Sequence, residues 1–131
     1  MATIREERAR AGAVELQRFV ASRPAAATVV VVGHSYGSTV IGLAAPGLDL
    51  LARPAVTDLV ALASPGLGVS GVAELHTRAR VWAGTADRDW IRYMPHGVDL
   101  TDRDFGARPL PTDKVSGHDS YLVPGSAASP G

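Results

Sequence analysis

A run of four valines followed by a Gly-x-Ser-x-Gly motif limits the folds open to this chain more than any other feature. Val29–Val32 precede Gly-His-Ser-Tyr-Gly at 33–37, and an apolar stretch that can be helical comes next. β-branched residues favour a strand, and we expect Gly33 and Gly37 to be needed because a Cβ at either would clash in a sharp turn. The pattern predicts a strand, a turn with Ser35 at its apex and a helix, which is the sequence form of a nucleophile elbow. The alternative is a glycine-rich turn in which Ser35 only caps the helix.

Helix and strand patterns alternate along the chain. A capping box at Thr3 and the proline at 24 bound a first helix, whose expected apolar stripe consists of Ile4, Ala11, Val14, Leu16, Phe19 and Val20. The further expected elements are strand 28–32, a helix from 35 to 45 ended by Pro-Gly at 46–47, strand 58–63, a short helix at 69–76, strand 80–83 and a weak edge strand at 107–110. This order predicts an α/β fold of three layers with a mostly parallel sheet. The uninterrupted apolar run at 28–32 predicts a strand covered on both faces.

Polar residues follow three of the predicted strands. Ser35, Ser64 and the segment 85–89 each come directly after a strand. Because ligands of open α/β sheets bind at the carboxyl ends of strands, these residues are expected to share one rim. The chain of 131 residues is expected to form a single domain over 1–124, with a flexible Gly- and Ser-rich tail at 125–131.

A serine hydroxyl needs a base, and the sequence offers four histidines. His118 is the favoured base, because it lies late in the chain, after a glycine and near an aromatic residue; His96, in a long loop, is the alternative. His34 adjoins the serine, and in a sharp turn its side chain is expected to point away from Oγ, so that it packs or supports the oxyanion site. His76 is expected to be solvated near the end of a short helix.

The base needs an orienting acid, which in hydrolases with this elbow lies between the serine and the histidine in the chain. Asp89 is favoured over Asp87, because the apolar residues that follow it can bury the carboxylate; Asp87 can instead pair with a neighbouring arginine at the surface. The backbone N–H of Tyr36 is the expected oxyanion donor. The loop that usually supplies a second donor has no counterpart here, so we expect either a substitute donor or weak activity.

Composition excludes several classes of function. The formal net charge is zero with no basic patch, so neither nucleic acid nor an anionic membrane is an expected partner. The chain has no cysteine, and its clustered aspartates at 99, 102 and 104 lack the spacing of a calcium loop, so no metal and no cofactor are expected. The charged N-terminal residues and the short apolar runs predict a cytoplasmic protein without a signal peptide or membrane span.

Several short stretches together resemble one known family. They are 32–38 around the serine, 58–60 with 63–66, 73–76, 89–92, 96–99, 105–108 and 117–121. In these stretches the chain resembles the actinobacterial α/β-hydrolase family catalogued as DUF1023. The resemblance implies a small, truncated α/β-hydrolase-like fold, with Ser35 as nucleophile, His118 as base and Asp89 as acid.

The chain begins near the helix before the nucleophile strand, so it looks like the C-terminal half of such a hydrolase. An exposed strand edge would then invite pairing with a second copy, and a homodimer is expected. The expected function is a serine hydrolase, carboxylesterase-like, that cleaves a small-molecule acyl ester through an acyl-enzyme. The alternatives are an acyltransferase or cyclase with the same triad, and a non-catalytic module that keeps the elbow as scaffold.

Overall fold

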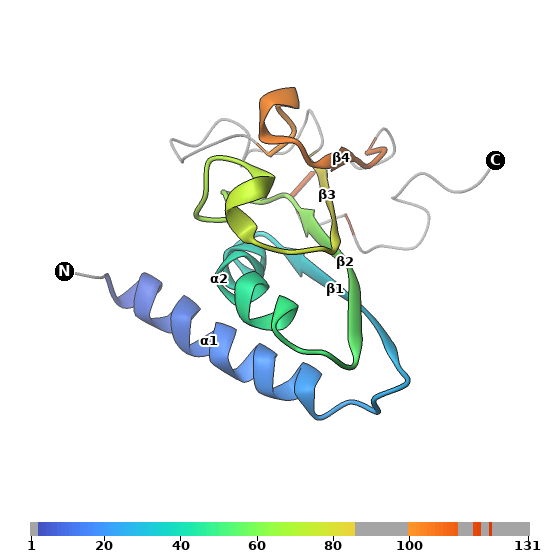
Figure 1. The fold of residues 1–131 in the computed structure, drawn as a ribbon. Coiled ribbons are helices and arrows are strands. Elements are labelled where there is room, and N and C mark those ends of the chain that lie inside the picture. The colour runs from blue at the N-terminus through green and yellow to red at the C-terminus, as the bar shows by residue number, and fades with distance from the viewer. Residues whose placement is uncertain (1–2, 86–99, 113–116, 119–120, 122–131) are drawn as a thin grey trace.

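The computed structural model describes residues 3–85, 100–112, 117, 118 and 121 (Figure 1). In chain order its elements are α1 (Ile4–Ala21), β1 (Thr28–His34), α2 (Gly37–Asp49), β2 (Ala55–Leu62), the 3₁₀ turn η1 (Val72–Leu75), β3 (Arg80–Gly84), the 3₁₀ turn η3 (Arg103–Phe105) and β4 (Arg108–Pro109). The predicted alternation of helix and strand is confirmed. The only difference in kind among these predicted elements is at 69–76, where the expected helix is the single turn η1.

The strands of the described residues form one four-stranded parallel sheet in the order β1-β2-β3-β4. The register pairs His34 with Leu62 and Leu62 with Gly84, so β1, β2 and β3 end at the same level. The predicted edge strand contains Pro109, and β4 does lie at the end of the sheet, where a missing N–H costs least. The parallel α/β fold class is thus as predicted, and the carboxyl ends of three strands form one rim.

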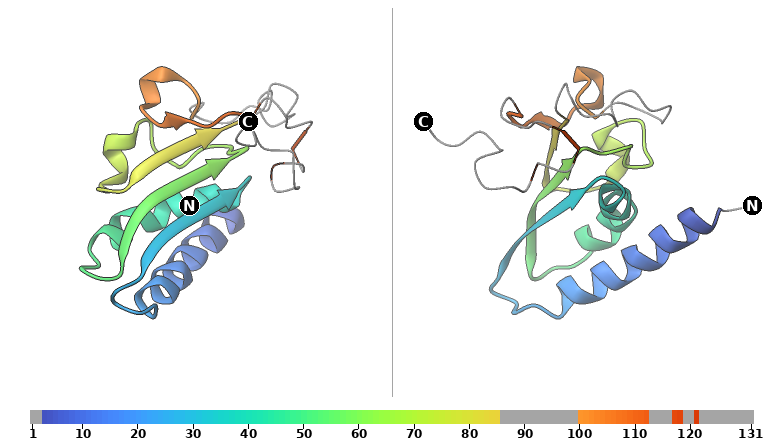
Figure 2. Two further views of the ribbon diagram at one scale, coloured as in Figure 1. Left: turned by 90° about the vertical axis from the view of Figure 1, so that its right-hand side faces the viewer. Right: turned by 180° about the vertical axis from the view of Figure 1, so that it is seen from behind.

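Both long helices lie on the same face of the sheet (Figure 2). On β1, Val31 points toward the helices and is 9% exposed, whereas Val30 and Val32 point to the other face and are 53% and 52% exposed. The prediction that strand 28–32 is covered on both faces is therefore wrong in this structure, and the described helices form one layer on the sheet rather than the two of the predicted three-layer arrangement. The valines favour a strand whichever way their side chains point, but the helices cover only one face of β1.

Helix α1 begins with the predicted capping box, in which Thr3 and Glu6 bond each other's backbone N–H. Its buried residues are Ala13 and Val20. The predicted stripe is right for Val20, which is buried, and for Leu16, which packs against the core, but wrong for Ile4, Val14 and Phe19, which are 69%, 44% and 59% exposed. The reason is that α1 packs on α2 rather than directly on the sheet, so only a narrow stripe of small residues is covered.

Helix α2 continues through Pro46 to Asp49, so the predicted end at 46–47 is wrong. A proline inside a helix removes one backbone hydrogen bond. Continuing the helix brings Leu48 into the core, where it is 3% exposed, and that burial favours the longer helix. In the described part of the chain, no helix combines the length and apolar character needed to cross a membrane.

Candidate active site

The turn between β1 and α2 has the geometry of a strained elbow. Ser35 has a φ of +56°, in the left-handed region that residues with a side chain rarely adopt. Its N–H donates a 2.8 Å hydrogen bond to the carbonyl of Leu62 on β2, which ties the turn to the rim of the sheet. A strained residue persists only where its surroundings hold it in place, and such residues cluster at functional sites.

The two motif glycines have different roles. A Cβ added to Gly33 would lie 2.6 Å from Ile41 Cδ1 and 2.9 Å from the backbone C and O of Gly37. A Cβ added to Gly37 would meet nothing within 4 Å. The prediction of a steric requirement therefore holds at Gly33 and is wrong at Gly37, because the helix turns that position toward open space.

The structure brings Ser35 and His118 together from distant parts of the chain. The distance between Ser35 Oγ and His118 Nε2 is 2.9 Å, within direct hydrogen-bond reach. His118 is only 9% exposed. His76 is exposed at the end of η1, as predicted, and takes no part in this contact. The alternative base His96 lies outside the described residues, as do the acid candidates Asp87 and Asp89.

His34 contacts the backbone of the favoured base. Its Nε2 lies 2.6 Å from the carbonyl oxygen of His118, and because a carbonyl only accepts, this nitrogen carries the proton. The His34 ring also lies 4.9 Å from that of His118 and 5.6 Å from that of Tyr121, between ring centroids. The sequence analysis missed this contact, although the alternation of β1 could have placed His34 on the face opposite Gly33.

Two buried serine hydroxyls form a hydrogen-bonded network with the backbone of the elbow. Ser38 Oγ lies 2.6 Å from the carbonyl of Ser35 and 2.5 Å from Ser64 Oγ, which also accepts from the N–H of Gly66 at 3.0 Å. Each hydroxyl has one proton, so the consistent arrangement is Ser64 donating to Ser38 and Ser38 donating to the Ser35 carbonyl. Ser38 and Ser64 are 0% and 6% exposed. The sequence analysis missed Ser38, whose only signal was a polar residue one turn into an apolar helix.

Tyr36 occupies the position expected of the oxyanion donor. It is the N-cap of α2, and within the described residues its backbone N–H makes no hydrogen bond. Its phenol accepts a 2.9 Å hydrogen bond from Arg5, whose guanidinium also lies 4.6 Å from the centre of the ring. The N–H is therefore available to a ligand beside Ser35.

A second polar cluster lies away from this rim, on the sheet face that the helices leave open. Asp58 accepts hydrogen bonds from Arg80, Thr57 and Trp82. These bonds, first of all those from Arg80, hold the pKa of Asp58 well below its usual range. The Asp58 carboxylate thus accepts four hydrogen bonds from described residues, two at each oxygen. No group of three or more potential metal ligands occurs in the described parts of the chain.

A parallel sheet whose first strand ends in a strained serine turn, with a histidine at that serine, defines the α/β-hydrolase class. A family model described as Alpha/beta hydrolase (Abhydrolase_8, formerly DUF1023) matches residues 1–98. The chain belongs to this family, and the resemblance stated from the sequence is confirmed. No curated protein and no solved structure matches the chain.

Proposed function

We propose that this protein is a serine hydrolase of the carboxylesterase type, which cleaves small acyl esters through an acyl-enzyme. Ser35 is the nucleophile, His118 the general base, Asp89 the orienting acid with Asp87 as its alternative, and the Tyr36 N–H an oxyanion donor. The observation that carries the proposal is the 2.9 Å distance between Ser35 Oγ and His118 Nε2 at a strained turn. No cofactor takes part in this chemistry.

The proposed reaction has two steps. Ser35 Oγ attacks the ester carbonyl while its proton passes to His118 Nε2, and the negative oxygen that forms lies at the Tyr36 N–H. The imidazolium then gives the proton to the leaving alkoxide, and the acyl group stays on Ser35. Water attacks this acyl-enzyme with His118 again as base, which releases the carboxylic acid and restores the serine.

The test is turnover of p-nitrophenyl acetate together with labelling by a fluorophosphonate probe. Ser35→Ala should abolish labelling, and Ser35→Ala and His118→Ala should each lower kcat by at least about 10³-fold. Ser22→Ala and His76→Ala are matched controls, because both residues are exposed and outside the site; they should behave as wild type. Turnover that is unchanged in Ser35→Ala would refute the proposal, and wild-type protein that neither turns over nor labels would favour the non-catalytic alternative.

A further inference from the structure

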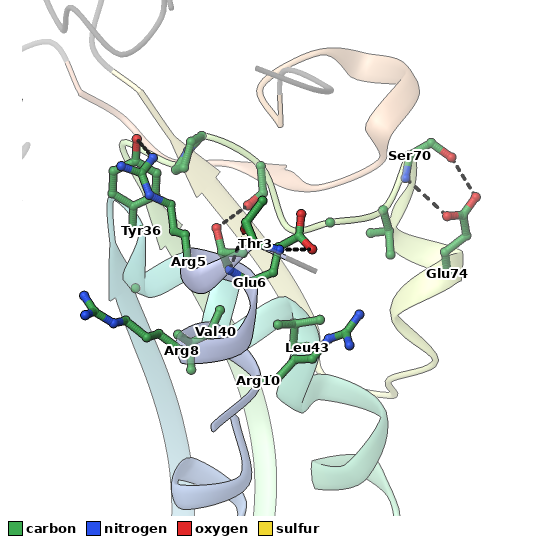
Figure 3. Close-up of a pocket in the computed structure, with 17 residues that line it drawn as sticks. Thr3, Arg5, Glu6, Arg8, Arg10, Tyr36, Val40, Leu43, Ser70 and Glu74 are labelled. Carbon is green, nitrogen blue, oxygen red and sulfur yellow. Dashed lines mark hydrogen bonds between the residues drawn. The ribbon is translucent and has the colours of Figure 1, made fainter. Parts of the chain in front are cut away.

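A groove runs beside the elbow on the helical side of the sheet (Figure 3). Its volume is about 990 Å³, and it lies between the first turns of α1, the start of α2 and the loop that follows β2. Helix α1 runs back toward the start of β1, so its first turns lie at the same end of the molecule as the strand rim (Figure 1). The groove therefore opens at the end of the sheet where open α/β folds bind ligands.

The groove begins next to the proposed nucleophile. Tyr36 and Gly37, which directly follow Ser35, form part of its lining. Arg5 reaches across from α1 and donates a hydrogen bond to the Tyr36 phenol, so these two side chains flank the groove beside the elbow (Figure 3). A ligand whose carbonyl carbon lies at Ser35 could therefore extend away from the elbow along α2.

Apolar side chains form the body of the groove. Val40 and Leu43 line it from α2, and Pro65 and Val69 line it from the loop after β2. Leu43 is 39% exposed, which is high for a leucine in the helical layer. An apolar surface left open to water beside a reactive group favours an apolar ligand.

The charged residues of the groove belong to its rim. Glu6 bonds the backbone of Thr3, and Glu74 accepts two hydrogen bonds from Ser70. Figure 3 shows Arg8 and Arg10 extending to opposite sides of α1, so their heads do not converge on one point. The rim therefore offers no focused site for an ion, whereas long charged side chains can cover an apolar chain with their stems.

We propose that this groove binds the acyl chain of the substrate, and that the preferred substrates are esters of medium-length fatty acids. This inference rests on the proposed hydrolase function and names its substrate class. The segment of α2 from Gly37 to Leu43 advances by about 9 Å at the rise of an α-helix, which leaves room for a chain well beyond acetyl. The chain passes Val40 and reaches Leu43, and the alcohol part of the ester leaves toward His118.

The experiment compares p-nitrophenyl acetate with p-nitrophenyl octanoate in three proteins. In wild type, kcat/KM should be at least about tenfold higher for the octanoate, since each buried methylene adds binding free energy. Leu43→Asn should lower the octanoate-to-acetate ratio by at least about fivefold. Leu50→Asn is the matched control, because Leu50 is also exposed (86%), lies just past α2 and does not line the groove; its ratio should equal that of wild type.

Binding of octanoate to Ser35→Ala, measured by calorimetry, tests the groove without catalysis. Octanoate should bind, and adding Leu43→Asn should weaken that binding whereas adding Leu50→Asn should not. Ser35-dependent acetate hydrolysis without a preference for octanoate would overturn the groove proposal and leave the hydrolase proposal standing. If no ester is turned over, the hydrolase proposal fails, and the calorimetry alone decides whether the groove takes an acyl chain.

Discussion

From the packing around Gly33 we expect the two glycines of the motif to differ in how well they tolerate alanine. In Gly33→Ala the new Cβ must displace Ile41 Cδ1, at 2.6 Å, and the backbone of Gly37, at 2.9 Å. Ile41 is 3% exposed and has little room to move, and the Gly37 carbonyl belongs to the first turn of α2. Overpacking of this kind costs about 1–3 kcal/mol. Gly37→Ala meets no atom, and an alanine in a helix is favoured over glycine by roughly 0.5–1 kcal/mol.

Thermal unfolding followed by circular dichroism measures the difference. At about 3–5 °C per kcal/mol for a domain of this size, Gly33→Ala should lower Tm by about 3–15 °C, and Gly37→Ala should leave it unchanged or raise it by a few degrees. Fluorophosphonate labelling of Ser35 should slow in Gly33→Ala, because α2 must move away from the strand end. A Gly33→Ala protein as stable as wild type, or an equal loss in Gly37→Ala, would refute the packing argument.

Three further predictions concern the buried hydroxyls, the carboxylate of Asp58 and the edge strand β1. Ser38→Ala leaves the Ser64 hydroxyl without its buried partner and should cost about 1–3 kcal/mol in urea unfolding, whereas Ser22→Ala, which loses an exposed hydroxyl bond to a carbonyl, should cost under about 0.5 kcal/mol; equal losses would argue against the buried network. The lowered pKa of Asp58 means that its ionised form stabilises the fold above the unfolded pKa of about 3.9 and that this contribution is lost as pH falls toward the lower folded pKa. The Tm difference between wild type and Asp58→Asn should therefore shrink from about pH 6 to about pH 2, and a constant difference would contradict it. The expected homodimer would pair through β1, which is the first strand of the sheet in the described residues and carries the exposed Val30 and Val32; sedimentation that gives only monomer at micromolar concentration would exclude it.

Local patterns predicted the elbow well. The valine run, the motif glycines and the helical stretch each carry a propensity that agrees with the fold, so β1, the turn at Ser35 and α2 could be placed from sequence. Ser35 and Ser64 were also predicted to share one rim, because each follows a parallel strand, and β1 and β2 do end at the same level. The order of residues along the chain also favoured His118 as the partner of Ser35, and the structure places Ser35 Oγ 2.9 Å from His118 Nε2.

The burial of side chains was predicted less well, because it depends on how the helices pack on the sheet and on one another. Apolar residues on α1 and β1 have the same propensity whether they face α2 or water, so Phe19 and Val32 could not be told from Val20 and Val31. The continuation of α2 past Pro46 was missed for a related reason. Pro46 disfavours a helix locally, whereas the burial of Leu48 favours continuing it. The sequence shows only the first of these two effects.

The contacts of His118, the proposed base, explain why one structural change should displace both Ser35 and His118. His118 is held by Ser35 Oγ and by the His34 ring, while Tyr121, three residues later, packs on Ala63 at the end of β2. All three supports come from the rim where β1 and β2 end, and the Leu62 carbonyl that anchors Ser35 belongs to the same rim. A change that shifts this rim therefore displaces Ser35 and His118, the proposed nucleophile and base, at once. Nearly all of the Gly33→Ala protein should still be folded at the assay temperature, so its lower Tm alone would hardly change the labelling rate. We nevertheless expect the labelling rate to fall, because the substitution displaces Ser35 and His118 within the folded protein.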